Sequence, residues 1–153
     1  MNDLSTMSAS GELITVIIGA QRFAIDIQLV REIRGWTTST PLPNAPDYVL
    51  GVINLRGAVL PVLNLAARLG LPASAAGPSS VVIVVDLVGR TVGLLVDAVS
   101  DIINVGEGEI QPAPVIGAAA NKGLARGMIT TDEGIITLID MSGILPTVAQ
   151  EAA

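Results

Sequence analysis

Short aliphatic runs separated by turn-forming residues recur along the whole chain, and this pattern predicts β-strands. Residues 12–19 and 22–26 predict a hairpin, because only two turn-like residues separate them. Residues 48–55 and 58–65 predict two more strands, which the Arg56-Gly57 turn joins. The remaining strand signals are two runs around the Val88-Gly89-Arg90 turn and a last hairpin around Asp132, Glu133 and Gly134.

Several segments depart from the strand pattern. Apolar residues at Ile27, Val30 and Ile33 have the i, i+3 spacing of a helical turn, which we expect to end at Gly35. Three prolines within residues 41–46 exclude a helix there and predict an extended loop. Pro61 predicts an edge strand or a bulge, and a short helix is expected to end at Gly70. We also expect a linker at residues 71–80 and a loop at residues 111–123. The two ends of the chain are expected to be a disordered lead at residues 1–10 and a flexible tail at residues 147–153.

Two parts of the chain repeat each other weakly, and such repeats bear on the architecture. The matching positions are Arg22, Val30, Glu32 and Ile33 with Arg90, Val99, Asp101 and Ile102, and the runs that end in Asn64-Leu65 and in Asp140-Met141. Each half supplies about five short strands, which is enough for a small closed barrel. The sequence therefore predicts an all-β fold with two similar halves.

Composition narrows the classes of function. Of the 153 residues, 8 are basic and 14 are acidic, which gives a net charge of −6. Because no basic face is available to neutralise phosphates, we expect no nucleic acid partner. The chain has no Cys and no His, which removes disulfides, thiolate metal sites and the usual general base near neutral pH. We expect neither a metal nor a cofactor.

Membrane segments are not expected either. The longest uncharged run, residues 69–85, contains two prolines and two glycines, so it is a poor candidate for an apolar helix of about 20 residues. Residues 1–10 lack the positive charge and the apolar core of a secretory signal. These features predict a cytoplasmic protein that does not insert into a membrane.

Carboxylates are the candidates for catalysis that the composition leaves. The aspartates considered are Asp26, Asp86, Asp97, Asp101 and Asp140, most of which lie at strand ends beside small residues. A solvated turn carboxylate is the simpler interpretation of such positions. Glycosidases nevertheless work with two such groups at a controlled separation, so a hydrolase that uses Asp97 and Asp140 is the alternative from another class. The composition favours an interaction module over an enzyme.

Three side chains have two open interpretations each. Arg56 either closes a hairpin turn and stacks on its own strands, or uses its planar donor fork at a protein interface. Glu32 either forms a local ion pair with Arg31 or Arg34, or meets a partner. Trp36, the only tryptophan, either covers one end of a barrel or anchors an interface.

Five motifs, in this order, closely resemble the chemotaxis coupling protein family CheW. They are VREIRG at residues 30–35, PLPNAPDYVLGVINLRG at 41–57, LPVLNL at 60–65, GLLVDAVSDI at 93–102 and IQPAPVI at 110–116. The resemblance runs from about residue 12 to residue 145, and its most specific block is PNAP-x-YV-x-GVINLRG.

This resemblance implies an all-β fold of two intertwined five-stranded SH3-like β-barrels with a few short helices, within a single domain at residues 11–146. The first barrel is expected at about residues 12–78 and the second at about residues 79–141, with the chain ends crossing between them. It also implies a non-enzymatic adaptor that joins the regulatory domain of the histidine kinase CheA to the cytoplasmic tip of methyl-accepting chemoreceptors, at the inner face of the membrane within receptor arrays. CheW-like chains also serve arrays for pilus motility and surface sensing.

Positions carried over from the family give candidate sites. The receptor-facing groove is expected at Val30, Glu32, Ile33, Gly51, Asn54, Leu55, Arg56, Gly57 and Val99. A helical receptor tip would rest aliphatic side chains on Val30 and Ile33, while charges at Glu32 and Arg56 would fix its register. The kinase-facing surface is expected at the barrel ends, at Trp36, Thr40, Leu42, Asp132 and Glu133.

The chain departs from the family pattern after the strand at residues 58–63. Many relatives carry an aspartate and an arginine where this chain has Asn64 and Ala66. The paired loss suggests that a salt bridge has been dispensed with, and it puts the usual kinase contact at this edge in doubt.

Overall fold

The computed structural model describes residues 11–72, 77–87, 89–112 and 124–144. The expected lead and tail, the middle of the linker and most of the loop at residues 111–123 lie outside the described residues. The strands are β1 (Glu12–Ile18), β2 (Gln21–Asp26), β3 (Val30–Gly35), β4 (Val49–Leu55), β5 (Ala58–Asn64), β6 (Val81–Leu87), β7 (Arg90–Val96), β8 (Ala98–Asn104), β9 (Ile110–Gln111), β10 (Ala125–Thr131) and β11 (Gly134–Ile139). The helical segments are α1 (Leu65–Arg68) and the 3-10 helices η2 (Ile27–Leu29), η3 (Glu107–Glu109) and η4 (Met141–Gly143). Within these described ranges, no helix has the length and apolar character needed to cross a bilayer.

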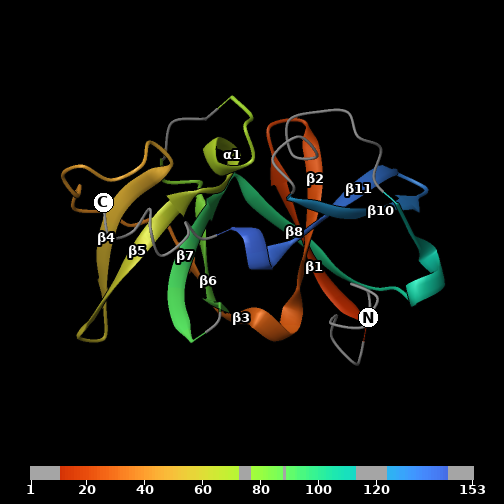
Figure 1. Ribbon diagram of the computed structural model, residues 1–153, viewed down its shortest axis with the longest axis horizontal. Coiled ribbons are helices and arrows are strands. Elements are labelled where there is room, and N and C mark those ends of the chain that lie inside the picture. The colour runs from red at the N-terminus through yellow and green to blue at the C-terminus, as the bar shows by residue number, and fades with distance from the viewer. Residues whose placement is uncertain (1–10, 73–76, 88, 113–123, 145–153) are drawn as a thin grey trace.

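The strands form two sheets, which lie side by side along the long axis of the molecule (Figure 1). The five-stranded sheet has the order β3-β6-β7-β5-β4, and the six-stranded sheet has the order β8-β1-β2-β11-β10-β9. Each sheet takes strands from the N-terminal and from the C-terminal half of the chain. In the six-stranded sheet β1 pairs with β8 and β2 pairs with β11. In the five-stranded sheet β6 pairs with β3 and β7 pairs with β5. The two sheets are therefore intertwined and do not divide at residue 78.

The weak repeat in the sequence corresponds to a repeated topology. In the five-stranded sheet Val30 lies opposite Val85, and in the six-stranded sheet Val99 lies opposite Val16. Each sheet also contains one parallel pair, β5 with β7 and β11 with β2, flanked by antiparallel hairpins. These relationships confirm the prediction of an all-β fold with two similar halves.

The ends of β5 and β11 repeat each other in detail. Asn64 caps α1, since its side-chain oxygen accepts a hydrogen bond from the N–H of Ala67 at 3.3 Å. Asp140 caps η4 in the same way, through the N–H of Ser142 at 3.1 Å. Ala66 is buried in the core. At the two positions where the chain departs from the pattern of the family that it resembles, it therefore has a helix cap and a core residue.

The apolar core joins the two sheets. Its largest cluster combines buried side chains of β1 and β2, such as Ile14 and Phe23, with buried side chains of β6 and β7, such as Ile83 and Leu94. Two smaller clusters lie within the six-stranded and the five-stranded sheet. Because burial of apolar surface is the main favourable term in folding, the shared cluster holds the sheets together.

The predicted helical turn up to Gly35 is wrong beyond its first three residues. Only Ile27–Leu29 is helical, and Val30–Gly35 is strand β3. Alternate β3 side chains are more and less exposed, and the strand pairs with β6 from a distant part of the chain. Tertiary pairing thus overrides a local spacing that fits one helical turn.

Pro61 lies in β5, an inner strand, so the predicted edge position is wrong. The alternative, a bulge, is present beside it, because the β4–β5 register shifts between Val49 and Gly51, opposite Leu63 and Val62.

The partner of Pro61, Val52, exchanges backbone hydrogen bonds with Thr40 on the outer side of β4, at 2.8 and 2.9 Å. The missing N–H of the proline therefore removes no hydrogen bond between β4 and β5. It removes none from the pairing on the other side of β5 either, because the parallel pairing with β7 begins only at Val62.

Candidate protein-binding surface

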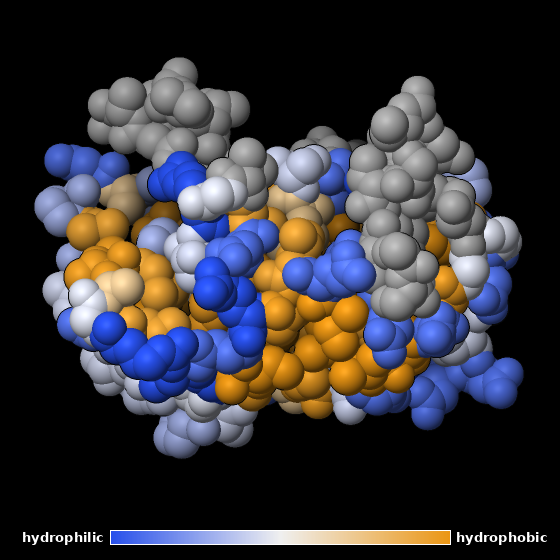
Figure 2. Space-filling view, turned by 90° about the horizontal axis from the view of Figure 1, so that it is seen from below, coloured by the Kyte–Doolittle hydropathy of each residue, from blue (hydrophilic) through white to orange (hydrophobic). Residues whose placement is uncertain are grey.

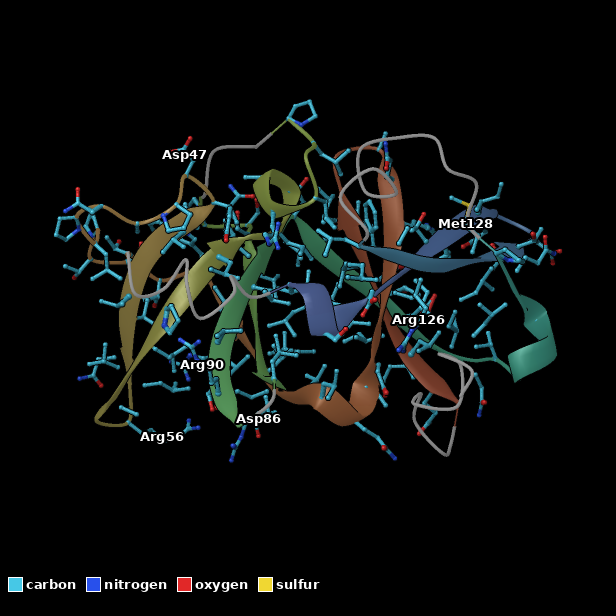
Figure 3. The ribbon with its side chains drawn as sticks, viewed as in Figure 1. Asp47, Arg56, Asp86, Arg90, Arg126 and Met128 are labelled. Atoms are coloured by element: carbon cyan, nitrogen blue, oxygen red, sulfur yellow. The ribbon has the colours of Figure 1, made fainter. Side chains whose placement is uncertain are left out.

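Glu32 on β3 and Arg56 in the β4–β5 turn form an ion pair. The second terminal nitrogen of the guanidinium, Nη1, lies 3.4 Å from Oε1 of Glu32. Because β3 and β4 are the two edges of the five-stranded sheet, the pair links one edge strand to the hairpin at the other edge. Figure 3 shows Arg56 at the end of this hairpin, on the same side of the molecule as Asp86. Arg56 therefore closes a turn and also reaches a different strand.

The residues of the turn fix the position of Arg56. Leu55 pairs with Ala58, so Arg56 and Gly57 form a two-residue turn. Their φ angles are 52° and 89°, the left-handed conformations of a type I′ hairpin turn. The side-chain oxygen of Asn54 accepts a hydrogen bond from the N–H of Gly57 at 2.9 Å. Asn54 and Gly57 thus serve the turn, and the turn presents the arginine.

Positive charge surrounds Glu32. Hydrogen bonding by Arg56 lowers the pKa of Glu32 below its ordinary value, Arg34 adds to this effect from 3.3 Å, and the bond to Glu32 raises the pKa of Arg56. Arg31 pairs instead with Asp86 on β6, at 2.8 Å. Of the two local ion pairs considered for Glu32, the structure contains the one with Arg34, and it adds the pair with Arg56.

Exposed aliphatic side chains accompany the ion pair. Val59 on β5 is 68% exposed and Ile33 on β3 is 48% exposed, and of these two Val59 lines a hollow beside the ion pair. Val30 belongs to the less exposed positions of β3 and borders the core between the sheets. A shallow hollow of about 380 Å³ opens beside the pair and is lined by Arg31, Glu32, Leu55, Arg56, Ala58, Val59, Leu60, Val84 and Thr91.

The structure brings only part of the predicted receptor-facing set to one surface. The residues at or beside the turn are Glu32, Asn54, Arg56 and Gly57. Leu55 packs in the interior core of the five-stranded sheet, and Gly51 is buried against Thr40. Val99 is half-buried on β8 of the other sheet, where it borders the same core cluster that Val30 borders from β3.

Sequence reasoning missed Val59 as a surface residue. The residue follows the Arg56-Gly57 turn by two positions and lines the hollow beside Arg56. The alternation of side chains along the strand could have indicated the exposure of Val59. Leu60 and Val62 are buried, so Val59 is directed to the opposite face. An aliphatic residue that such alternation directs outward is a candidate contact.

Three of the predicted kinase-facing residues lie at the β4 edge of the five-stranded sheet. Trp36 is partly buried and packs against the interior core of that sheet, which agrees with a residue that covers one end. Thr40 forms an isolated bridge with Val52 of β4. Leu42 follows and is 45% exposed.

The other two predicted kinase-facing residues, Asp132 and Glu133, lie in the β10–β11 turn of the six-stranded sheet. Glu133 accepts a hydrogen bond from Arg22 of β2 at 2.6 Å. A second shallow hollow here is lined by Thr15, Arg22, Asp101, Ile103, Thr131, Asp132, Glu133 and Ile136. Because β4 and the β10–β11 hairpin lie at opposite ends of the molecule (Figure 1), the five predicted residues do not form one surface.

Three of the five aspartates considered for catalysis bond to backbone groups of turns and caps, whereas Asp86 pairs with Arg31 and Asp101 lines the second hollow. Asp97 accepts a hydrogen bond from the N–H of Gly19 at 2.7 Å, and Asp140 caps η4. Asp26 accepts a hydrogen bond from the N–H of Gln28 at 3.0 Å. Neither of the two hollows is lined by Asp97 or Asp140. These contacts support the simpler interpretation and give the hydrolase alternative no geometric support.

Known proteins resemble this chain over nearly its whole length. The family model of the CheW-like domain matches residues 12–149. The chemotaxis protein CheW of Rhizobium meliloti is 49% identical over 142 residues, which cover 93% of this chain and 92% of the relative. The probable chemotaxis protein CheW of Rhizobium etli is 48% identical over 142 residues, with the same coverage of 93% and 92%.

A solved structure gives the same result for the fold. The crystal structure of the scaffolding protein TtCheW from Thermoanaerobacter tengcongensis matches this chain with a TM-score of 0.82 and 26% identity. The match covers 94% of this chain and 92% of that one. The sequence motifs, the intertwined sheets and these comparisons lead to one conclusion: the chain belongs to the CheW-like family.

Proposed function

We propose that this protein is a chemotaxis adaptor without chemistry of its own, which couples methyl-accepting chemoreceptors to a CheA-type histidine kinase. Membership of the CheW-like family supports a role as a chemotaxis scaffold. The observation that carries the receptor-facing part of the proposal is the Glu32–Arg56 pair, which lies beside exposed Val59 and above a shallow hollow.

The chemistry of this surface suits a helical receptor tip with acidic and aliphatic side chains. The side chain of Arg56 is 70% exposed, whereas that of Glu32 is 26% exposed, so the arginine is the more accessible member of the pair. A guanidinium has five N–H donors, and the pair with Glu32 leaves some of them for a partner. Val59 of β5 and Ile33 of β3 offer aliphatic contacts from two strands that are not adjacent in the sheet. Complementary charge would then fix the register of the helix.

The kinase is proposed to contact the ends of the molecule. One end carries the loop with Trp36, Thr40 and Leu42, and the other carries the β10–β11 turn with Asp132 and Glu133. Figure 2 shows a broad hydrophobic area across the middle of the face seen from below, with hydrophilic side chains along its left border. A receptor helix at the Arg56 turn would lie on the five-stranded sheet, so it would leave the β10–β11 end accessible to a kinase domain.

The proposed location is the cytoplasm, at the inner face of the membrane, within receptor arrays. An adaptor for pilus motility or surface sensing would require the same two surfaces, whereas a protein that binds the kinase without receptors would require only the kinase-facing one. The identity of the neighbouring receptor and kinase genes would distinguish these pathways.

A reconstitution with receptor fragment, kinase and this protein tests the proposal. We expect the wild-type protein to bind both partners, with micromolar affinity as a plausible order, and to place kinase activity under receptor control. The Arg56→Glu variant should lose receptor binding and receptor control, because it puts a carboxylate beside Glu32 and reverses the most exposed charge of the surface. Its melting temperature should stay close to that of the wild type, since exposed ion pairs contribute little to stability.

Arg22→Glu is the matched control, because Arg22 belongs to an ion pair with a hairpin turn in the other sheet. This variant should keep its affinity for the receptor fragment. A combined Glu32→Arg and Arg56→Glu variant separates two roles of the pair, which are to join β3 to the turn and to present a positive charge to the receptor. If it regains wild-type coupling, the pair acts only by joining β3 to the turn. Absence of binding between the wild-type protein and either partner would refute the adaptor function itself.

A further inference from the structure

Each sheet carries an additional backbone segment on an outer strand. In the five-stranded sheet, Thr40 bridges Val52 of β4 through two hydrogen bonds, at 2.9 Å from the Thr40 N–H and at 2.8 Å to the Thr40 carbonyl oxygen. In the six-stranded sheet, β9 pairs with β10 at Met128 and Ile129. Both segments cover strands that would otherwise present an unpaired edge.

A glycine lies under each of these segments. A Cβ atom at Gly51 would overlap the carbonyl of Thr40, 2.6 Å from its carbon and 3.0 Å from the nitrogen of Pro41. A Cβ atom at Gly127 would lie 2.6 Å from Cγ2 of Ile110 and 2.9 Å from the carbonyl oxygen of Gln111. Contacts this short force something to move, and at Gly51 the obstacle is backbone, which cannot rotate away.

The two glycines occupy equivalent positions in the repeated topology. Gly51 lies opposite Val62 of β5, directly after the register shift that begins at Val49. Gly127 lies opposite Leu138 of β11, directly after the register shift that begins at Ala125. Bulges of this kind bend a strand and redirect its edge. The same device therefore recurs in both halves.

We propose that Gly51 is a positioning residue, which seats the loop at residues 37–46 on β4 by leaving room for Thr40 and Pro41, and that Gly127 seats β9 on β10. Gly51 consequently acts on partners through this loop and not by contact with a receptor. The relevance to partners rests on the proposed adaptor function, because the loop carries Thr40 and Leu42 of the kinase-facing set and adjoins Trp36.

The test uses the isolated full-length protein, so it stands even if the adaptor function fails. Hydrogen exchange by NMR follows the amides of Thr40 and Val52, whose bonds hold the loop, and fluorescence follows Trp36, the only tryptophan. In Gly51→Ala we expect both amides to exchange at least about tenfold faster and the Trp36 emission to move to longer wavelength. The amides of β9 and β10 should keep their wild-type protection. In Gly127→Ala we expect the amides of β9 and β10 to exchange faster, while the amides of Thr40 and Val52 keep their wild-type protection.

Gly134→Ala is the matched control for backbone strain. Gly134 has a φ of 134°, close to the 150° of Gly51, but nothing lies within 4 Å of its Cβ position. This variant should leave the amides of Thr40 and Val52 unchanged. If it affects them as Gly51→Ala does, or if Gly51→Ala leaves their exchange and the Trp36 emission at wild-type values, the proposal is wrong.

A second variant should release the loop from β4 by a change in the loop itself. Thr40→Pro removes the N–H that donates to Val52 but leaves Gly51 in place. It should reproduce the faster exchange of Val52 and the Trp36 shift even if Gly51→Ala does not fold. Wild-type exchange of Val52 in this variant would contradict the seating role.

Discussion

The guanidinium of Arg68 donates from Nε to the carbonyl oxygen of Ile144 at 2.6 Å, which ties α1 to the described end of the chain. Its Nη2 donates to the carbonyl oxygen of Gly143 at 2.7 Å, and the group lies 4.8 Å from the centre of the Tyr48 ring. Since α1 follows β5 of one sheet and η4 follows β11 of the other, Arg68 connects the two sheets by polar contacts where the core connects them by apolar ones.

Loss of this link should weaken the fold. In Arg68→Met the apolar stem remains but two carbonyl oxygens lose their donors, so we expect the free energy of unfolding to fall by about 1–3 kcal/mol. Urea denaturation followed by circular dichroism measures the change. Arg68→Lys should lose an intermediate amount, because an ammonium cannot reproduce the planar two-point contact. Full wild-type stability in Arg68→Met would show that water satisfies the two carbonyls equally well.

The core between the sheets predicts a larger effect at Phe23, which is 1% exposed. We expect Phe23→Ala to lower the free energy of unfolding by about 3–5 kcal/mol, because it removes packed apolar surface and leaves a cavity. The measurement is again urea denaturation, with Val59→Ala as the control. Val59 is 68% exposed, so its truncation should change stability by no more than about 0.5 kcal/mol. A loss of less than about 1 kcal/mol in Phe23→Ala would mean that the sheets repack around the gap.

The Glu32–Arg56 pair predicts a pH dependence. Because the folded-state pKa of Glu32 lies below its unfolded-state value, the ionised carboxylate stabilises the fold at neutral pH. This contribution is complete above the ordinary glutamate pKa of about 4.3 and is lost as the pH falls through the lowered pKa. Arg56→Ala should move the pKa of Glu32 upward, yet not to its ordinary value, since Arg34 stays 3.3 Å away.

An NMR titration of the Glu32 carboxyl carbon measures this shift. Arg22→Ala serves as the control, because it removes an arginine from an ion pair of the other sheet and should leave the Glu32 titration unchanged. An unchanged Glu32 pKa in Arg56→Ala would indicate that the two side chains do not stay paired in solution.

Much of the fold was predictable from local patterns. The two-residue turns at Arg56-Gly57 and at Asp132-Glu133 fall where the sequence places them, because turn geometry is set by the few residues that adopt it. The echo between Val30 and Val99 was also visible, and it corresponds to equivalent strand pairs. These features depend on neighbours in the sequence or on direct comparison of two segments.

The candidate site was less predictable, because it depends on contacts between distant segments. Sequence motifs marked Glu32 and Arg56 as separate partner contacts, whereas in the fold they bond to each other across the edges of one sheet. Gly51 belonged to the same predicted groove, but the approach of Thr40 buries it. Neither relationship has a signature in local spacing.

By itself, the sequence determined the strand-rich class, the two similar halves, the turn that carries Arg56 and the resemblance to one family, since alternation, turn chemistry and motifs are local properties. Only the tertiary structure decided which strands share a sheet and that Val30–Gly35 is extended. It also decided that Arg56 is the more exposed member of its ion pair with Glu32. The physical reason is that a β-strand satisfies its backbone hydrogen bonds with a partner that is often remote in the chain.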